Sequence, residues 1–543
     1  MKKLLIFFIC LLTPMFVLSQ NSLADKIDAG FRKYTTWFVD SIFYEIPITE
    51  SFSVPWVVII LIGGAIYFTL SFKLINFTGF LSAIRIIRGD YEDIENVGAE
   101  YLYKDVKVED QPKMVEEIRK KKEASGQVSH FQALATAVSA TVGLGNIAGV
   151  AIAISIGGPG ATFWMIIGGL LGMATKFVEC TLGVKYREED EQGRIYGGPM
   201  YYLKKGLAEK GFAKTGKILG VIFAILITIG AFGIGNMFQA NQASAQFTAL
   251  FNGSNSMSLW VGAALAILVG LVIIGGVKRI AGVTEKVVPF MAGIYVLSAL
   301  IILGVNYQHI GSAVKMIFEG AFTGAGIAGG VVGVMIIGIR RSAFSNEAGV
   351  GSSPTAHAAV KTKYPASEGI VALLEPFIDT VVVCTITALI IIITNFDANI
   401  VEYGTEISEG VQVTAKAFDS AIPHFSIILT IAVILFAIST MISWSYYGLQ
   451  GWMFIFGKND KARLTYNILF SIFVWIGSAV SLDAVIDFAD SMIFAMAVPN
   501  VIGIILLTSV VKKELKKYRE AMLLKHKAIA NGLKDMNEFI KEK

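Results

Sequence analysis

Residues 139–149 read SATVGLGNIAG and lie in the middle of a long apolar run that spans residues 130–156. Glycine costs about 1 kcal/mol relative to alanine inside a helix, so the glycines at 143, 145 and 149 weaken any helix formed there. Inside a bilayer, backbone that leaves a helix finds no water to bond, and it persists only where it is packed in protein or lines a cavity. The stretch therefore predicts a membrane-spanning helix that is interrupted at residues 143–146.

The composition of the whole chain supports a membrane location. The chain has 543 residues, of which 54% are hydrophobic and 16% are charged, and its mean hydropathy is +0.64. An ordinary soluble domain is about one quarter charged. Many apolar runs are about 20 residues long, which is the length that a helix needs to cross a bilayer. We therefore expect an all-α polytopic membrane protein with about eleven transmembrane helices, near residues 54–72, 130–156, 161–184, 218–239, 259–277, 283–305, 327–341, 370–394, 426–456, 464–480 and 484–511.

The basic residues distinguish the two sides of the membrane. Lysine and arginine concentrate in every second loop and in the tail VKKELKKYREAMLLKHK, whereas the alternate loops between spans have Lys315 and Lys416 as their basic side chains. This is the positive-inside pattern, and it predicts an N-terminus outside and a C-terminus in the cytoplasm. We expect the membrane to be a bacterial inner membrane.

The N-terminal and C-terminal regions extend beyond the main set of spans. Residues 1–19 combine Lys2 and Lys3, a short apolar run and small residues at 17 and 19, which is typical of a cleavable signal peptide. An uncleaved anchor is the alternative. Residues 20–53 are predicted to be a periplasmic amphipathic segment, 54–72 an extra transmembrane helix, 73–128 a cytoplasmic loop and 512–543 a cytoplasmic tail.

About ten spans follow the extra helix, and they divide into two sets, at residues 129–305 and 306–511. Because each set has an odd number of spans, the second is inverted relative to the first, as in transporters whose substrate site lies where interrupted helices meet. The first helix of the second set is also interrupted, because the polar residues 340–347 follow its apolar run. Interrupted helices offer amides to an anion and carbonyls to a cation.

Other classes of function find less support in the sequence. Cys10, Cys180 and Cys384 form no CxxC metal motif or disulfide framework, and the histidines are scattered. The sequence contains no Walker motif and no nucleophile–base set, so we expect no ATP drive, no enzyme activity, no cofactor and no nucleic-acid partner. A channel is the alternative from another class, but the paired interruptions favour a carrier.

Several long motifs resemble the alanine or glycine:cation symporter family. They are GQVSHFQALATAVSATVGLGNIAGVA, GGPGATFWM, GMATKFVE, YGGPMYY, GNMFQAN and FSNEAGVGSSPTAHAA, and the similarity extends from residue 126 to the last span. The resemblance implies the 5+5 inverted-repeat fold of the bacterial leucine transporter. It also implies import of a small neutral amino acid, alanine or glycine with serine as a further candidate, coupled to sodium or alternatively to protons. The family often has Thr-Gly-Asn where this chain has Leu144-Gly145-Asn146, which removes one hydroxyl ligand.

The resemblance also implies roles for the interrupted first helix. The residues expected to hold the substrate carboxylate there are Thr141, Gly143, Leu144 and Gly145. Hydroxyl and carbonyl oxygens suit sodium, a hard cation. The sodium ligands are accordingly expected to be Asn146, Ala140, Gly143, Ser439 and Thr440. For the two hydroxyls, a hydrogen bond to the preceding helical turn is the alternative.

Three further side chains are candidates for the substrate pocket. Trp444 lies one turn after Thr440 on the same helical face, where it would shrink the pocket to fit a methyl group. An ordinary core tryptophan is the alternative. Phe344 is expected to form the opposite wall. Gln239, three residues after Asn236, is expected to accept a hydrogen bond from the substrate ammonium or to make an interhelical polar contact.

Charged residues at membrane depth are costly and are usually functional or paired. Arg340, Arg341 and Glu347 are therefore interpreted as a gate or as part of an ion pair.

Two further charged pairs lie on neighbouring helical turns. One of Glu375 and Asp379 is expected to pair with an arginine or to relay protons. Lys176 and Glu179 are expected to neutralise each other, because residues three apart share a helical face.

Overall fold

The computed structural model describes residues 20–49, 52–92, 94, 126–253, 255–324, 329–407 and 410–530. The predicted signal peptide, residues 95–125 of the predicted cytoplasmic loop and the end of the tail lie outside the described residues. The described chain is mostly helical, with two short hairpins, β1 (Glu45–Thr49) with β2 (Phe52–Pro55) and β3 (Glu188–Glu189) with β4 (Ile195–Tyr196). The all-α class predicted from the sequence is confirmed.

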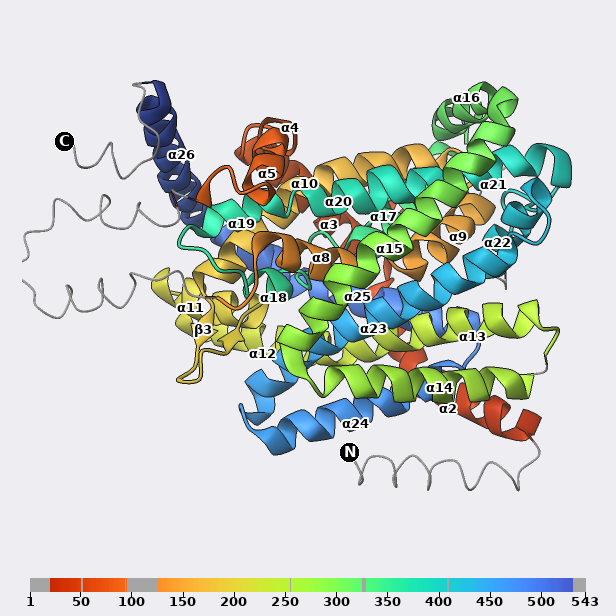
Figure 1. The fold of residues 1–543 in the computed structure, drawn as a ribbon, viewed down its shortest axis with the longest axis horizontal. Coiled ribbons are helices and arrows are strands. Elements are labelled where there is room, and N and C mark those ends of the chain that lie inside the picture. The colour runs from red at the N-terminus through yellow and green to blue at the C-terminus, as the bar shows by residue number, and fades with distance from the viewer. Residues whose placement is uncertain are drawn as a thin grey trace, which may run out of the picture.

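The first half of the chain forms a helical series that Figure 1 shows in red to green. Its N-terminal elements are α2 (Gln20–Ile42), α3 (Trp56–Ser71), α4 (Ile75–Thr78) and α5 (Phe80–Ile87). The series continues with α8 (His130–Thr141), the 3-10 turn η2 (Leu144–Asn146), α9 (Ala148–Gly157), α10 (Ala161–Lys185), α11 (Pro199–Glu209), α12 (Ala213–Phe232), the π-helix η3 (Gly233–Met237), α13 (Phe238–Leu250), α14 (Asn255–Ile273), α15 (Gly276–Val305) and α16 (Tyr307–Thr323).

The second half, shown in green to blue, begins with another interrupted helix. Its elements are α17 (Gly330–Asn346), α18 (Pro354–His357), α19 (Pro365–Val371), α20 (Leu374–Pro376), the π-helix η4 (Phe377–Cys384), α21 (Thr385–Ala398), α22 (Gly410–Ala421), α23 (Ser426–Phe456), α24 (Asp460–Gly477), α25 (Leu482–Leu506) and α26 (Thr508–Ala530). Segments 307–323 and 410–421, predicted as parts of loops, are therefore helical.

The described helices fit a membrane protein. Six of them are long and apolar enough to cross a membrane, or eight when each of two bent pairs is counted as one span. On α15, Phe290, Leu297 and Leu300 are 61%, 63% and 53% exposed. Large apolar side chains gathered on a surface suit lipid better than water. The number of eleven spans includes shorter helices such as α14 and α17, and it stays a prediction.

The basic loops gather at one end of the molecule. Figure 1 places α11, β3 and α26 on one side of the helical body and α16 and α22 on the other. We call these the basic end and the far end. That the basic end faces the cytoplasm stays a prediction of the positive-inside rule.

The first interruption lies where the sequence predicted it. The helix α8 begins with a capping box, in which Ser129 and Gln132 exchange backbone-to-side-chain hydrogen bonds of 3.1 and 3.2 Å. It ends because Val142 leaves helical geometry at ψ 89° and Gly143 is extended. After one 3-10 turn the chain continues as α9, and the two arms are bent by 55°.

The second interruption lies further along the chain than predicted. The polar residues from Arg340 to Asn346 are helical, because their side chains find partners on other helices, and α17 ends only at Asn346. Glu347 then adopts a left-handed conformation with φ 56°, and the side-chain oxygen of Asn346 accepts the N–H of Ala348 at 2.9 Å. The non-helical segment therefore comprises residues 347–353, and the prediction of 340–347 was one to two turns too early.

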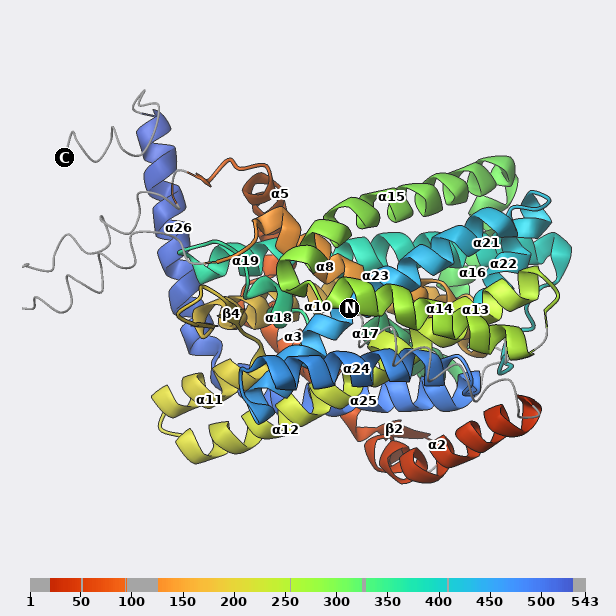
Figure 2. The same ribbon diagram turned by 60° about the horizontal axis from the view of Figure 1, so that its bottom comes forward.

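The helix α2 is fastened to the far end of α25. Asp28 accepts hydrogen bonds from the N–H and the hydroxyl of Ser481 at 3.0 and 2.6 Å, and Arg32 pairs with Asp483 at 2.7 Å. Figure 2 shows α2 along the outside of the helical body. Burial opposes the ionisation of Asp28, but the hydrogen bonds from Ser481 and the pairing with Arg32 outweigh it and hold the pKa of Asp28 below its ordinary value.

This contact predicts a pH-dependent stability difference. A carboxyl with a lowered pKa stabilises the folded state above its ordinary pKa, and it loses that contribution as the pH falls through the lowered value. We expect Asp28→Asn to reduce stability at pH 7 by up to about 1 kcal/mol, as for other partly exposed pairs. The difference should vanish well below about pH 4. Thermal unfolding of both proteins across this pH range checks it; an equal difference at every pH would contradict it.

Candidate functional site

The first interruption turns its amides toward side-chain oxygens. The N–H of Gly143 donates to Oδ1 of Asn146 at 2.9 Å, and the N–H of Leu144 donates to Oε1 of Gln239 at 3.2 Å. These amides are not spent on helical hydrogen bonds, as the sequence predicted. In this structure, however, two side-chain amides occupy the places where the sequence predicted a substrate carboxylate. A bound carboxylate would replace or share these acceptors.

The glycines of the interruption allow two other helices to come close. A Cβ atom added at Gly143 would lie 2.6 Å from Oγ1 of Thr440 on α23. One added at Gly145 would lie 3.3 Å from the ring of Phe344 on α17. The interruption therefore sits between α23 and α17 and brings both helices against its backbone.

Asn146 joins the two interrupted helices to a third one. Its Nδ2 atom donates to Oγ of Ser345 at 3.0 Å and to Oδ1 of Asp379 at 2.7 Å. Ser345 and Thr380 also donate to Oδ2 of Asp379, at 2.6 and 2.8 Å. Asp379 is fully buried on η4. From the sequence, Asp379 or Glu375 was expected to pair with an arginine or to relay protons; the contact with Asn146 was not foreseen, because Asn146 is distant in the chain.

Hydroxyl groups gather where α8 ends against α23. Thr440 donates to the carbonyl of Ser139 at 2.9 Å. The hydroxyl of Ser139 lies 3.0 Å from the hydroxyls of both Ser439 and Ser443. The structure thus brings the predicted pair Ser439 and Thr440 to the last turn of α8, which also contains the predicted ligand Ala140. Ser139 and Ser443 are members that the sequence analysis missed, although serine at helical spacing from Thr440 was a visible signal.

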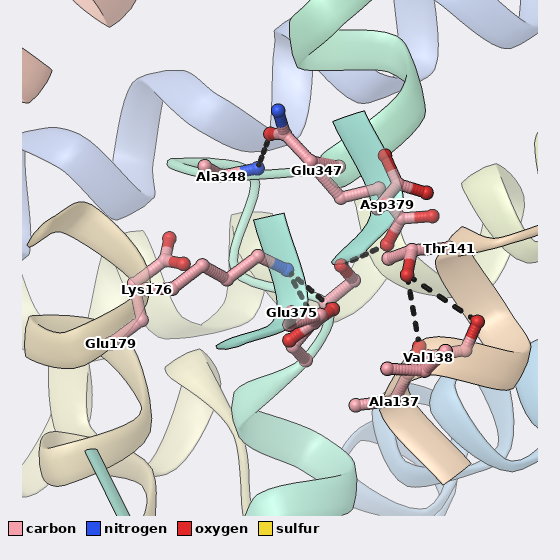
Figure 3. A network of polar contacts seen from close by, with 12 residues as sticks. Ala137, Val138, Thr141, Lys176, Glu179, Glu347, Ala348, Glu375 and Asp379 are labelled. Carbon is pink, nitrogen blue, oxygen red and sulfur yellow. Dashed lines mark hydrogen bonds and ion pairs between the residues drawn. The ribbon is translucent and has the colours of Figure 1, made fainter. Parts of the chain in front are cut away.

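Thr141 is turned away from this cluster. Its hydroxyl donates back to the carbonyl oxygens of Ala137 and Val138, at 3.3 and 3.5 Å (Figure 3). Thr141 can therefore contribute backbone atoms to the interruption, while its hydroxyl is used within α8.

Of the two predicted aromatic side chains, Phe344 borders the first interruption and Trp444 contacts the second. Trp444 is fully buried, and its Nε1 atom donates to Oε1 of Glu347 at 3.1 Å. The Trp444 side chain packs so closely on η3 that a Cβ atom added at Gly235 would lie 2.2 Å from Cβ of Trp444 and 2.4 Å from Cγ of its indole. Phe344 packs edge-to-face on Phe238, with ring centroids 5.4 Å apart. The contributions of Gly235 and Phe238 were not visible in the sequence.

Gln239 makes an interhelical contact instead of offering a free oxygen. Besides the bond from Leu144, its Nε2 atom donates to the carbonyl of Ile234 at 3.2 Å. Asn236 lies on η3, the π-helix that precedes α13, and donates to the carbonyl of Phe470 on α24 at 2.7 Å. Of the two readings left open by the sequence, this structure shows the polar contact.

The buried charges pair differently from the prediction. Lys176 forms its ion pair with Glu375 at 3.0 Å (Figure 3), and not with Glu179. Glu179 instead accepts a hydrogen bond from Asn500. The prediction that Lys176 and Glu179 pair with each other was wrong. Both side chains point into the protein, where Glu375 of α20 and Asn500 of α25 offer closer groups.

The two arginines of α17 share one acid on α25. Arg340 lies 2.7 Å from Oδ2 of Asp490, and Arg341 contacts the same oxygen. The expectation that Glu375 or Asp379 pairs with an arginine was therefore wrong. The Arg340 guanidinium also lies 4.1 Å from the ring centre of Phe43, and that of Arg341 lies 5.2 Å from that of Phe344. The cluster thus lies between the predicted pocket wall and the far end.

A cavity of about 250 Å³ opens at the basic end, beside the same α23 that carries Thr440 and Trp444. Tyr446 and Gln450 of α23 line it, together with Arg194 and Lys278. Tyr446 follows Trp444 by two residues on α23, so the cavity begins near the candidate site along this helix.

A polytopic helical body whose two interrupted helices meet at a buried polar centre defines a membrane transporter. The comparisons with known proteins agree. A sequence model of the sodium:alanine symporter family matches residues 99–531. The chain belongs to this family, which consists of transporters and not of enzymes.

Individual relatives support the same assignment. The chain is 44% identical to the sodium/alanine symporter AgcS of Methanococcus maripaludis, over 73% of this chain and 85% of that protein. It is 34% identical to the amino-acid carrier protein AlsT of Bacillus subtilis, over 87% of this chain and 91% of AlsT. Among solved structures, MhsT in complex with L-phenylalanine matches with a TM-score of 0.54 and 17% identity, over 72% of this chain and 92% of MhsT. This last likeness concerns the fold alone.

Proposed function

We propose that the chain imports a small neutral amino acid, alanine or glycine, together with sodium by alternating access. The observation that carries this proposal is the meeting of backbone and hydroxyl groups at the first interruption: the N–H groups of Gly143 and Leu144 are turned off the helix, and Thr440 closes on Gly143 and on the last turn of α8. The same α23 carries Trp444, whose indole reaches Glu347 at the second interruption. Backbone amides suit the substrate carboxylate, and oxygen atoms suit a sodium ion. The names of AgcS and AlsT, an alanine symporter and an amino-acid carrier, point the same way.

Alanine uptake into proteoliposomes tests this function. With an inward sodium gradient, we expect uptake that saturates with alanine and exceeds uptake without the gradient severalfold. An imposed proton gradient without sodium distinguishes the coupling ion. Uptake that is indifferent to both gradients, or that rises linearly with alanine as through a pore, would overturn the proposal.

The size of the pocket predicts selectivity. Trp444→Ala removes the indole beside the interruption, so larger side chains gain room. Hydrophobic pockets discriminate one methylene by about 1–3 kcal/mol, so we expect leucine to compete at least about tenfold better against alanine in this variant. Inhibition of labelled alanine uptake by unlabelled leucine measures the change.

Trp444→Phe is the matched control for this prediction. It keeps an aromatic ring but loses the Nε1 donor to Glu347. If leucine gains equally in both variants, the hydrogen bond and not the volume of the indole sets the selectivity. If leucine gains in neither, Trp444 does not border the substrate.

A further inference from the structure

A row of buried titratable side chains leads from the basic end into the protein. It starts at His130, the first residue of α8, whose side chain is 17% exposed and whose Nδ1 atom contacts Oε2 of Glu368. The other oxygen of Glu368 lies 2.5 Å from Nδ1 of His357. Nε2 of His357 lies 3.5 Å from Oε2 of Glu375, and Oε1 of Glu375 lies 3.0 Å from Nζ of Lys176. Histidines and carboxylates thus alternate along the row.

The inner end of this row reaches the proposed substrate site. Ser353 contacts Lys176 and donates to Glu375 at 2.6 Å. The next residue toward α17, Ser352, donates to the carboxyl of Glu347. The other oxygen of Glu347 accepts the Trp444 indole N–H. Ser353, which contacts the row, and Ser352, which contacts Glu347, are neighbours in the chain, so they link the row that starts at the partly exposed His130 with Glu347 and Trp444.

The charges of this cluster do not balance when all of its acids are ionised. Glu179, Glu347, Glu368 and Glu375 would carry four negative charges, whereas Lys176, His130 and His357 carry at most three positive ones. Uncompensated charge in a buried environment is costly. The surrounding elements face the cluster with Cys180 of α10, Tyr202 of α11, Trp444 and Tyr447 of α23, Asn500 of α25 and one further acid, Asp379 of η4. The guanidinium of Arg187 lies near the outer part of the row, where it donates to the backbone carbonyls of Ala358 and Val360.

We propose that the cluster is a proton-binding site that loads from the basic end through His130, and that its inner carboxyl, Glu347, links proton occupancy to substrate release. The proposal rests on the amino-acid transport proposed above. Only N–H and O–H bonds form and break: a proton enters at the His130 ring, passes along Glu368, His357 and Glu375, and reaches Glu347 through the two serine hydroxyls. The cluster gains one positive charge.

Protonation of Glu347 has a direct structural consequence. The ionised carboxyl is attracted to the Lys176 ammonium on α10, and it accepts the Trp444 indole N–H on α23. Glu347 is also where α17 ends. Neutralising it weakens the attraction that holds the 347–353 segment against α10 and loosens the contact with the pocket wall. A proton from the basic end therefore favours opening toward that end.

Right-side-out membrane vesicles test this, because their lumen faces the predicted cytoplasmic end. With external pH and sodium fixed, we expect initial alanine uptake to rise severalfold as lumenal pH falls from 8 to 6. Glu347→Gln should lose this dependence, because its side chain is always neutral. His130→Asn keeps a nitrogen donor near the position of Nδ1 but cannot titrate, and it should flatten the dependence as well.

Glu514→Gln is the control for the variants. Glu514 pairs with Lys185 at the basic end of the same α10, outside the row, and this variant should keep the wild-type response to lumenal pH. If Glu347→Gln does not fold, as thermal unfolding would reveal, His130→Asn still decides the outcome. A wild-type response that persists in His130→Asn overturns the proposed entry route.

A direct measurement of protons gives a second readout. In weakly buffered detergent solution with a pH indicator, adding alanine and sodium to the wild-type protein should change the number of bound protons, with no such change in Glu347→Gln. Sodium-driven uptake without any dependence on lumenal pH would overturn the proton site and leave the transport function intact. No sodium-driven uptake at any lumenal pH would instead remove the transport function.

Discussion

Gly143→Ala is expected to reduce alanine uptake strongly while the protein remains folded. The added Cβ atom would lie 2.6 Å from Oγ1 of Thr440 and 3.3 Å from Oε1 of Gln239. Both atoms already make hydrogen bonds to the backbone. Oγ1 of Thr440 donates to the carbonyl of Ser139, and Oε1 of Gln239 accepts the N–H of Leu144. Overpacking costs about 1–3 kcal/mol, and 1.4 kcal/mol corresponds to tenfold, so uptake should fall by about 5- to 150-fold.

Gly149→Ala is the matched control, because it lies on the continuation of the same interrupted helix. Apart from its chain neighbours and the backbone of its own helix, no described atom lies within 4 Å of a Cβ added at Gly149. Within α9 the substitution also favours the helix by about 1 kcal/mol. Sodium-dependent uptake and thermal unfolding of both variants check the prediction. Equal uptake by the two variants would show that the close approach of Thr440 is not needed for transport.

Lys176→Met is expected to have the largest effect on stability. The ammonium is fully buried, and it compensates Glu375 and faces Glu347 and Glu179. Breaking a buried ion pair by removing one partner costs about 3–5 kcal/mol, because the other charge is left buried. The free energy of unfolding in detergent should fall by about that amount.

Two further variants separate this charge effect from the loss of a long side chain. Lys185→Met removes a lysine from the last turn of the same α10, where the pair with Glu514 is partly exposed, and the cost there should stay below about 1 kcal/mol. In the double variant Lys176→Met with Glu375→Gln, the orphaned carboxylate is removed too. Coupling energies of contacting residues reach about 0.5–3 kcal/mol, so the double variant should be more stable than Lys176→Met alone by an amount in this range. If the free-energy changes of the two single substitutions simply add in the double variant, the interaction between Lys176 and Glu375 does not account for the loss of stability.

The two interruptions differ in how well the sequence predicted them. The first was located correctly because its cause is local: Gly143 and Gly145 weaken a helix whose neighbours are apolar. The second was placed too early because Arg340 and Asn346 look like helix-breaking polarity inside a membrane. They remain helical since Asp490 and Thr380, both distant in the chain, satisfy them. Long-range partners of this kind cannot be read from local pattern.

The residues of the candidate site also divide into those that local sequence could predict and those that depend on distant partners. Ser439, Thr440 and Trp444 could be selected because hydroxyls and an indole share one face of an apolar helix. Asp379 could not be assigned correctly, because its role depends on Asn146, which is 233 positions away. Side-chain direction decided the remaining cases: Gln239 lies at the interruption as expected, but its oxygen accepts a backbone N–H.

The fastening of α2 to α25 has a consequence for biosynthesis. Asp28 and Ser481 are 453 positions apart. At roughly 5–20 residues per second, about half a minute to a minute and a half passes between the synthesis of the two residues. During that time α2 can rest only on elements made earlier, such as α14, and it lacks its hydrogen bonds and ion pair to the start of α25. A chain that stalls before α25 therefore lacks this polar contact, which forms only when the last long apolar helix has been made.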